Sequence, residues 1–342
     1  MTSTRSRLII PRTRKLKALR RIFLFSLLLL SSVHGQNQSA FNPQPPRPRI
    51  RLPIFAFEPH AANPILSSQG STWEAQAVTN AAALVKHDTL FLLYTAEDQI
   101  RFGTWNGTAR IGLAFSTDGV NFTRAAEPVL QPTLDVETPG GCRDPRVIFA
   151  DNVYYMTYSA FDFKTPRLAL ATSSNLREWK KHGLLLPDTG ATKAGAMFPQ
   201  KVNGRYVMYY GKQEEVRIAY SNDLVHWFPQ AEPVLRPRYG KFDSEALEPG
   251  PPPVIIDSTI VLLYNARDLN GRSACGLVRF SLDNPTTVLA RLDSPLFTPL
   301  STSVKFEASG LIWFRGQYEL FYNWTATTLG KAGGKLLYTE SK

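Results

Sequence analysis

Cysteine is scarce in this sequence of 342 residues, which has only two, Cys142 and Cys275. Two cysteines cannot build the disulfide framework that stabilises small secreted domains, so the fold must depend on a hydrophobic core. The sequence leaves open whether the two thiols form one bridge in an oxidising compartment or stay free and buried. None of the five histidines lies with a cysteine at the spacing of a zinc site, and we therefore expect no metal.

Nucleotide-binding motifs and a basic surface are also missing. The sequence has no glycine-rich phosphate loop and no dinucleotide fingerprint, so we expect no cofactor. Its formal net charge of +11 comes from the N-terminus, because residues 1–51 hold 11 of the 39 Lys and Arg and none of the 28 Asp and Glu. The rest of the chain has 28 residues of each sign, which argues against a nucleic-acid partner.

The apolar run near the N-terminus is too short to cross a membrane. It covers about twelve residues, 22–33, whereas a membrane-spanning helix needs roughly 20. A basic segment precedes it and small residues surround Gly35, a layout that predicts a secretory signal over residues 1–35, with an uncleaved type II anchor as the alternative. Residues 36–52, rich in Gln, Pro and Arg, are typical of a linker. Four sequons favour a secreted glycoprotein: Asn37, Asn106, Asn121 and Asn323.

What the sequence does contain is an internal repeat. Segments that begin with Ser and end six residues later in an aromatic residue are found at 116–122 (STDGVNF), 173–179 (SSNLREW) and 221–227 (SNDLVHW), with a weaker copy at Ser281. Consecutive serines of these copies are 57, 48 and 60 residues apart, a spacing typical of propeller blades with four short strands each. We expect the repeated segment to be a turn in which a polar side chain caps its own backbone, and therefore to be structural.

Five further segments have the aromatic and branched residues of strands and are too short for helices. They are residues 89–94 (TLFLLY), 153–158 (VYYMTY), 206–210 (YVMYY), 260–264 (IVLLY) and 318–322 (YELFY). One such strand per repeat divides the roughly 290 residues after the leader into blades of about 58. The sequence therefore predicts an all-β protein, a five-bladed β-propeller in a single domain over residues 53–342.

Polar residues at the starts of blades are the candidates for chemistry, because propeller loops converge on the central axis. The strongest candidate is the segment 140–146 (GGCRDPR), which leads directly into an apolar strand. This order places the Asp144 carboxylate at the axis, with Arg143 and Arg146 available to hold it or a substrate anion. The alternative is that Asp144 only caps a turn.

At these residues the sequence resembles a known family. Gly-x-x-Asp-Pro-Arg at 141–146, the segment 197–208 (MFPQKVNGRYVM) and the segment 250–254 (GPPPV) are similar, in order and spacing, to the five-bladed β-mannoside phosphorylases and mannosidases of glycoside hydrolase family 130. The resemblance covers roughly residues 60–325. It implies action on β-mannosides with inversion, in which Asp144 donates a proton through a sugar hydroxyl. In phosphorylase members inorganic phosphate attacks, so phosphate is a possible co-substrate.

The resemblance also implies roles for other residues. Asn80 matches a sugar contact, and Glu307 matches a glutamate that binds mannose. Lys193 and Lys212 fall at or near basic positions that hold phosphate, although each is equally well explained as a solvated surface charge. From the residues alone, Glu248, together with Glu245, is a candidate base for activating water. Asp268 follows a segment where related proteins place polar pocket residues.

Three departures from the family pattern bear on phosphate use. Thr95 stands where phosphorylases carry an arginine that grips phosphate, and residues 323–326 (NWTA) lack the terminal carboxylate of the family. Arg143 replaces an acid that often precedes the catalytic aspartate. A sequon at Asn323 conflicts with that residue facing a pocket.

The sequence therefore predicts a carbohydrate-active enzyme that cleaves β-mannosidic bonds of an oligosaccharide with inversion, by phosphorolysis or hydrolysis. One alternative is a secreted propeller that binds glycans without turnover, which the departures above would produce. The other is a fructan- or arabinan-type five-bladed glycoside hydrolase. Fructan hydrolases share the Arg-Asp-Pro triplet, but their Asn-Asp-Pro and Glu-Cys pairs do not occur in this sequence. The oligomeric state is not determined by these patterns.

Overall fold

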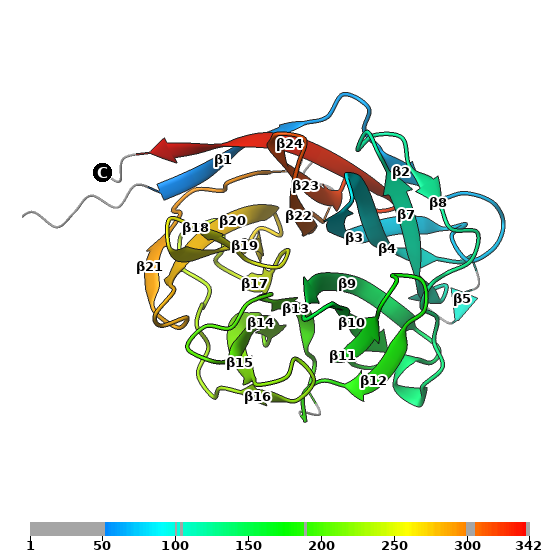
Figure 1. The fold of residues 1–342 in the computed structure, drawn as a ribbon, viewed down its shortest axis with the longest axis horizontal. Coiled ribbons are helices and arrows are strands. Elements are labelled where there is room, and N and C mark those ends of the chain that lie inside the picture. Colours follow the sequence, from blue (N-terminus) through cyan, green and yellow to red (C-terminus); the bar gives the residue numbers. More distant parts are fainter. Residues whose placement is uncertain (1–51, 100, 103–104, 188–189, 299–304, 340–342) are drawn as a thin grey trace, which may run out of the picture. The chain divides into compact units, whose positions relative to one another are not determined.

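The computed structural model describes residues 52–99, 101–102, 105–187, 190–298 and 305–339. The predicted signal and nearly all of the predicted linker lie outside these residues. Across the described ranges the chain forms 24 β-strands and one short 3₁₀ turn, η1 (Asp135–Glu137), and no α-helix. The strands form antiparallel blades around a central axis, as Figure 1 shows, and the first two blades are joined into one eight-stranded sheet by a single parallel pairing. The predicted all-β, five-bladed propeller is confirmed.

Each blade is a short antiparallel meander whose first strand lies innermost. Blade I consists of β3 (Ala77–Lys86), β4 (Thr89–Glu97), β7 (Ala109–Ser116) and β8 (Thr123–Arg124), with β5 (Arg101–Phe102) and β6 (Trp105–Asn106) as a small hairpin between them. Blade II consists of β9 (Gly141–Ala150), β10 (Val153–Phe161), β11 (Pro166–Ser173) and β12 (Lys180–Leu184). Blade III consists of β13 (Lys193–Met197), β14 (Tyr206–Lys212), β15 (Glu215–Ser221) and β16 (Trp227–Pro229).

The last two blades differ slightly from this plan. Blade IV has its inner strand in two pieces, and consists of β17 (Ala246–Pro249), β18 (Val254–Ile256), β19 (Thr259–Arg267), β20 (Ser273–Ser281) and β21 (Val288–Arg291). Blade V consists of β22 (Ala308–Phe314), β23 (Gln317–Asn323), β24 (Thr328–Thr339), β1 (Leu52–Pro59) and β2 (Leu66–Ser67). The five strand segments that the sequence predicted are β4, β10, β14, β19 and β23, the second strand of each blade.

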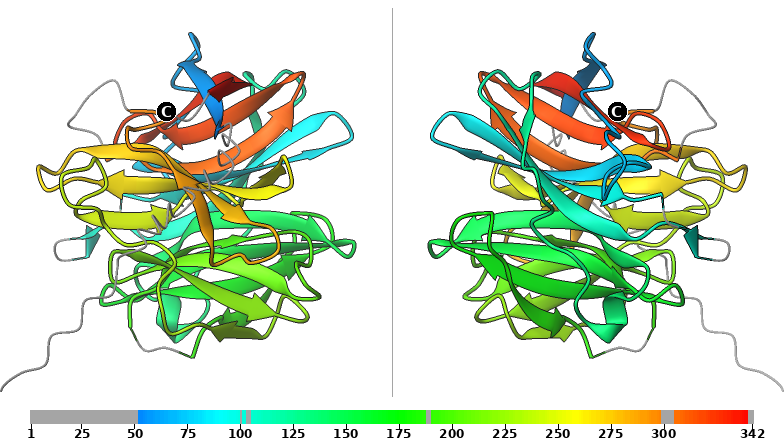
Figure 2. Two further views of the ribbon diagram at one scale, coloured as in Figure 1. Left: turned by 90° about the vertical axis from the view of Figure 1, so that its left-hand side faces the viewer. Right: turned by 90° about the vertical axis from the view of Figure 1, so that its right-hand side faces the viewer.

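The ring is closed by the N-terminal strand, which the sequence did not predict. β1 pairs antiparallel with β24 from Leu52 opposite Thr339 to Pro59 opposite Ala332. The blue β1 and the red β24 lie together in Figure 1 and in both side views of Figure 2. Blade V therefore contains strands from both ends of the domain, which ties its first and last segments into one cooperative sheet.

The repeated Ser segment forms the predicted capped turn. In blade I, Ser116 Oγ accepts a hydrogen bond from Gly119 N at 2.8 Å, and Asp118 Oδ1 accepts one from Val120 N at 2.8 Å. The copy in blade III has the same arrangement around Ser221. These short polar side chains replace a backbone partner, which is why they recur wherever the chain turns between outer strands.

A buried carboxylate anchors the loop before the inner strand in three blades. In each case the acid accepts hydrogen bonds from the hydroxyl of a buried tyrosine on the second strand and from a cation. The three sets are Glu74 with Tyr94 and Arg124, Glu137 with Tyr158 and Lys181, and Asp243 with Tyr264 and Arg291. Burying a charge is costly unless it is paired and hydrogen-bonded, so each set stabilises only one placement of the loop. The inner strands, which line the axis, start from these fixed loops.

The two cysteines are free and buried, which decides between the alternatives left open by the sequence. Burial raises the pKa of Cys275 to about 12. The described residues include no group of three or more His, Cys, Asp or Glu side chains that could hold a metal ion. They also include no helix long and apolar enough to span a bilayer.

Candidate active site

The inner strands are bulged near the axis. The strand register slips between Thr79 and Ala82 in β3, next to Asp144 in β9, between Lys193 and Ala196 in β13 and between Ala308 and Gly310 in β22. Asn80, Asp144 and Ala194 have positive φ angles of 47°, 56° and 52°. Residues other than glycine seldom have a positive φ, and both bulges and such strained residues are typical of functional sites.

These bulges surround a cavity of about 60 Å³ at the axis, which we call the axial pocket. Its lining comes from all five blades and consists of Asn80, Asp144, Arg146, Lys193, Ala194, Glu248, Lys305 and Glu307. A second cavity of about 80 Å³ adjoins it and shares Lys193, Glu248 and Lys305. The axial pocket therefore combines three carboxylates, three cations and one amide in a small volume.

Asp144 is held on both sides by neighbouring blades. Its backbone N donates a hydrogen bond to Thr95 Oγ1 at 2.8 Å, and its carboxylate accepts one from the side-chain amide of Asn80. The backbone N of Asn80 in turn donates to Asn323 Oδ1 at 2.9 Å. The carboxylate is thus fixed through contacts that cross from blade I to blade II and from blade V to blade I.

The same contact recurs elsewhere in the ring. On the second strand of blades I, IV and V, the residue after a buried tyrosine is polar and hydrogen-bonds to the bulge of the next blade. Thr95 binds Asp144, Asn323 binds Asn80, and Asn265 both accepts from Ala308 N at 2.8 Å and donates to Ala308 O at 3.1 Å. These three residues position the pocket rather than line it. The Tyr–polar pairs at 94–95, 264–265 and 322–323 are the sequence signal that could have identified them.

Every cation of the axial pocket is engaged. Lys193 Nζ lies 2.6 Å from Glu248 Oε2, and Lys305 forms an ion pair with Glu307. The guanidinium of Arg146 is buried, with Nε donating to Gly250 O at 2.7 Å. Burial lowers the pKa of Arg146, which three nearby carboxylates only partly offset. The positive charge of the pocket is therefore already balanced by its own acids.

The two glutamates are driven in opposite directions by their surroundings. Burial alone raises the pKa of Glu248, but Lys193 and Lys305 outweigh it and bring the value to about 2. Burial also raises the pKa of Glu307, and there the opposing attraction of Lys305 is insufficient, so the pKa stays above its usual value. The pocket therefore places one carboxylate that is held ionised, Glu248, beside one that is protonated more readily, Glu307.

Comparison with known proteins agrees with this geometry. Residues 50–311 match the family model described as β-1,4-mannooligosaccharide phosphorylase, glycoside hydrolase family 130. The chain belongs to glycoside hydrolase family 130. The match covers most of the propeller and includes every residue that lines the axial pocket.

Individual relatives agree with this family assignment. The 1,2-β-oligomannan phosphorylase of Thermoanaerobacter sp. (strain X514) is 34% identical over 233 residues, which are 66% of this chain and 77% of that protein. The β-1,2-mannobiose phosphorylase of the same strain is 30% identical over 275 residues, 76% of this chain and 87% of that protein. A solved structure of family 130 glycoside hydrolases that target β-1,2 mannosidic linkages in Candida mannan has a TM-score of 0.77 and 31% identity, over 82% of this chain and 94% of that one.

Most of the residues that the sequence selected meet in the axial pocket of this family 130 protein. Six of them line it: Asn80, Asp144, Arg146, Lys193, Glu248 and Glu307. Lys305 was missed, although it stands two residues before Glu307, where a Lys-x-Glu pair on one face of an extended chain could have indicated it.

The other three selected residues lie outside the lining of the axial pocket. Arg143 pairs with Glu97 at 3.3 Å and lies over the ring of Phe161, 5.3 Å from its centroid. Lys212 is the last residue of β14. Asp268 accepts hydrogen bonds from the backbone of its own loop and lines a separate groove. Neither Lys212, at the end of the second strand of blade III, nor Asp268, in the β19–β20 loop, lies on an inner strand, and Arg143 is drawn to Glu97 although it is adjacent to Asp144.

Thr95 and Asn323 have a different explanation from the one that the sequence suggested. The sequence interpretation treats Thr95 as the loss of an anion contact and Asn323 as a sequon that conflicts with a pocket position. In the structure both side chains instead hold a bulge of the next blade. Asn323 is buried, and its side-chain amide donates a hydrogen bond to Glu307 Oε2 at 3.4 Å. The amide nitrogen to which a glycan would be attached is therefore inside the folded protein.

Proposed function

We propose that this protein cleaves β-mannosidic bonds with inversion at the anomeric carbon, with Asp144 as the proton donor. The observation that carries the proposal is the placement of Asp144 in a strained bulge of β9, where blades I and V hold it in the same cavity as Glu248 and Glu307. A positioned carboxyl opposite further carboxylates is what glycoside cleavage needs.

The family description and the individual relatives point to different linkages. The family model is described by β-1,4-mannooligosaccharides, whereas the curated relatives and the solved structure are named for β-1,2 linkages. We favour β-1,2-linked mannosides as the substrate, because the names of the two curated relatives, which match 66% and 76% of this chain, both specify that linkage, whereas the family description covers all members.

Water suits the axial pocket better than phosphate as the attacking group. A phosphate ion would need free cations, but Lys193 and Lys305 are each paired with a glutamate and Arg146 is bound to backbone oxygens. It would also be repelled by the three carboxylates of the lining. Glu248 is the carboxylate that Lys193 and Lys305 keep ionised, and its place in the pocket makes it the candidate base that activates water.

Phosphorolysis is the second candidate, and the names of the two curated relatives favour it. Phosphate binding would require Lys193 and Lys305 to leave their glutamates. Under either mechanism a sugar ring requires movement, because a cavity of about 60 Å³ is far smaller than the roughly 300–1,000 Å³ of usual ligand sites. The Lys305 side chain is 64% exposed, so it has room to swing outward.

The test is to incubate the purified protein with β-1,2-mannobiose, with and without inorganic phosphate. Mannose released at the same rate in both reactions supports hydrolysis, and mannose 1-phosphate formed only with phosphate supports phosphorolysis instead. If neither product forms and the protein still binds mannobiose, the protein is a glycan-binding propeller without turnover. Asp144→Asn should abolish turnover with little change in melting temperature, and unchanged activity in this variant would remove Asp144 from its role.

We further propose that residues 1–35 direct the chain into the secretory route. The basic segment followed by a short apolar run supports this, as do the sequons. Asn121 supports it best, since its side chain is exposed on the repeated turn. Fusing residues 1–35 to a reporter would test it: a reporter that stays inside the cell would contradict the proposal, and one retained on the membrane would indicate the anchor.

A further inference from the structure

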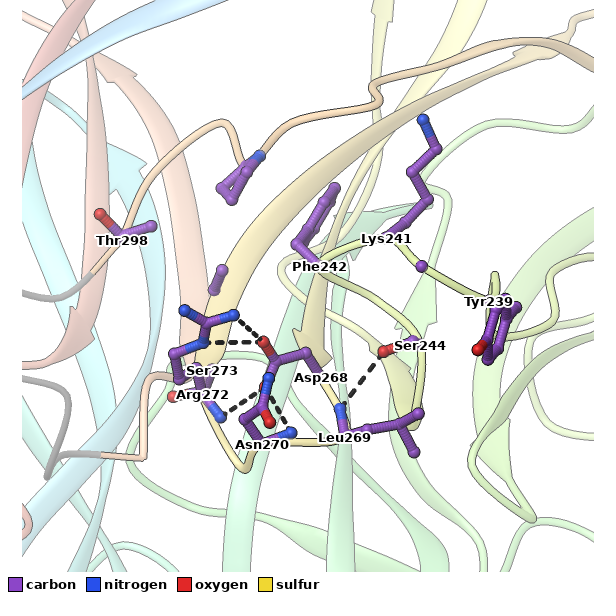
Figure 3. A pocket seen from close by; sticks show the side chains of 13 residues that line it. Tyr239, Lys241, Phe242, Ser244, Asp268, Leu269, Asn270, Arg272, Ser273 and Thr298 are labelled. Atoms are coloured by element: carbon purple, nitrogen blue, oxygen red, sulfur yellow. Dashed lines mark hydrogen bonds and ion pairs between the residues drawn. The ribbon is translucent and has the colours of Figure 1, made fainter.

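A large groove lies beside the axial pocket and has no assigned role. It has a volume of about 740 Å³ and lies between the loop that precedes β17 and the β19–β20 loop. Its walls include Tyr239, Phe242 and Ser244 from the first loop and Asp268, Asn270 and Arg272 from the second, as Figure 3 shows. We call it the blade IV groove.

The blade IV groove continues to the axial pocket. Ser273 lines both the groove and the adjoining cavity of about 80 Å³. That cavity shares Lys193, Glu248 and Lys305 with the axial pocket. The axial pocket, the second cavity and the blade IV groove therefore adjoin in that order through shared lining residues, so the groove is the next large hollow beside the axis.

An aromatic side chain stands at the far end of the groove. Tyr239 is 94% exposed, a large value for a residue that normally buries its ring. Leu269, on the opposite loop, is 65% exposed. The floor is rigid, because Phe242 stacks on the buried Tyr264 with ring centroids 6.2 Å apart. A flat, exposed ring above a fixed floor suits a ligand with an apolar face and polar edges, such as a sugar ring.

The charges of the groove are internally balanced. Asp268 accepts from Arg272 Nε at 2.8 Å and from the backbone N of Asn270 at 2.9 Å. Lys241 lies 3.3 Å from a carboxylate oxygen of Asp293. The groove therefore offers hydrogen-bonding groups without an unpaired charge among its described lining residues, which favours a neutral polyhydroxyl ligand over an anion.

We propose that the blade IV groove binds the mannosyl units on the leaving-group side of the scissile bond, with Tyr239 as a stacking platform. The proposal rests on the proposed function, because the axial pocket must hold the mannosyl unit that is transferred. Binding of these additional sugar units in the groove would make the enzyme prefer oligosaccharides longer than two sugars. Arg272, held by Asp268 and 65% exposed, supplies donors to the hydroxyl groups of the bound chain.

The experiment compares kcat/KM for β-1,2-mannotetraose and β-1,2-mannobiose in the wild type, in Tyr239→Ala and in Phe228→Ala. Phe228 is a matched control, since it is also an exposed aromatic residue, 63% exposed, but lies on β16 outside the groove. We expect the tetraose-to-mannobiose ratio to fall roughly tenfold in Tyr239→Ala, a loss of about 1.4 kcal/mol, and to stay unchanged in Phe228→Ala.

Equilibrium binding of mannotetraose to Asp144→Asn, with and without Tyr239→Ala, separates this proposal from the proposed function. If the wild type cleaves no mannoside but Tyr239→Ala weakens binding, the groove is supported and the proposed function is overturned. Normal cleavage with an unchanged ratio and unchanged binding would overturn the groove and leave the proposed function standing. Melting temperatures of both variants should match the wild type, because neither side chain is buried.

Discussion

The bond between Thr95 and the bulge of β9 gives a sharp test of how the site is built. Thr95→Val keeps the shape and volume of the side chain but removes Oγ1, which accepts the hydrogen bond from Asp144 N at 2.8 Å. Because Thr95 is 2% exposed, water cannot easily replace the lost partner. An unsatisfied amide in such a place costs about 1–2 kcal/mol.

The free energy lost with this hydrogen bond is similar to the backbone strain at Asp144 that the hydrogen bond offsets. Asp144 has a φ of 56°, and a residue held in this region stores about 1–3 kcal/mol, which its surroundings must overcome. Without the Thr95 bond the bulge can relax, and Asp144 leaves its place for part of the time. We therefore expect kcat on β-1,2-mannobiose to fall about 5- to 30-fold, with a smaller change in KM, because a proton donor acts mainly in the transition state.

Two variants separate positioning from stability. Thr95→Ser retains the accepting oxygen and should keep kcat near that of the wild type. Thr259→Val removes a buried hydroxyl that donates at 2.8 Å to Ile256 O in the β18–β19 hairpin, away from the lining of the axial pocket, and should lower the melting temperature without lowering kcat. If Thr95→Val turned over like the wild type, or if Thr259→Val lost as much kcat, the bond would have no part in placing Asp144.

Three further predictions concern charge, packing and modification. Glu248 has a folded pKa of about 2, lowered from 4.5, so its stabilising effect is present above pH 4.5 and is lost as the pH falls toward 2. The free energy of unfolding in urea should therefore be higher for the wild type than for Glu248→Gln by up to about 3 kcal/mol at pH 7, and by much less at pH 3; the same difference at both pH values would contradict this. Tyr158→Phe removes a 2.7 Å hydrogen bond to the buried Glu137 and should cost about 1–3 kcal/mol in thermal unfolding while kcat stays normal; a lower kcat would show that this anchor reaches the site. In protein secreted from a eukaryotic host, peptide mapping should find glycan on Asn121 and none on Asn323, whose side chain is buried; glycan on Asn323 would refute its placement.

The sequence was sufficient for the features that depend on neighbours in the chain. The second strand of each blade is a short run of aromatic and branched residues, and the capped turns need only a serine and a short polar residue close by. Asp144 could also be predicted from the sequence, because the Asp-Pro-Arg segment occurs only once in a repeat that is otherwise regular. Arg143 shows the limit of this reasoning: it is adjacent to Asp144 and yet pairs with Glu97 instead of lining the axial pocket.

The features that the sequence did not reveal depend on residues far apart in the chain. The bond from Asn80 to Asn323 joins positions separated by 243 residues, and β1 meets β24 only when the ring closes. The Tyr322–Asn323 pair resembles the Tyr–polar pairs of blades I and IV, but only the closed ring shows that Asn323 meets Asn80. The sequence by itself determined the number of blades, their second strands and the aspartate at the axis, since local alternation and turn chemistry specify these. The tertiary structure alone decided which polar residues meet there, because each bulge is held by a side chain from the neighbouring blade.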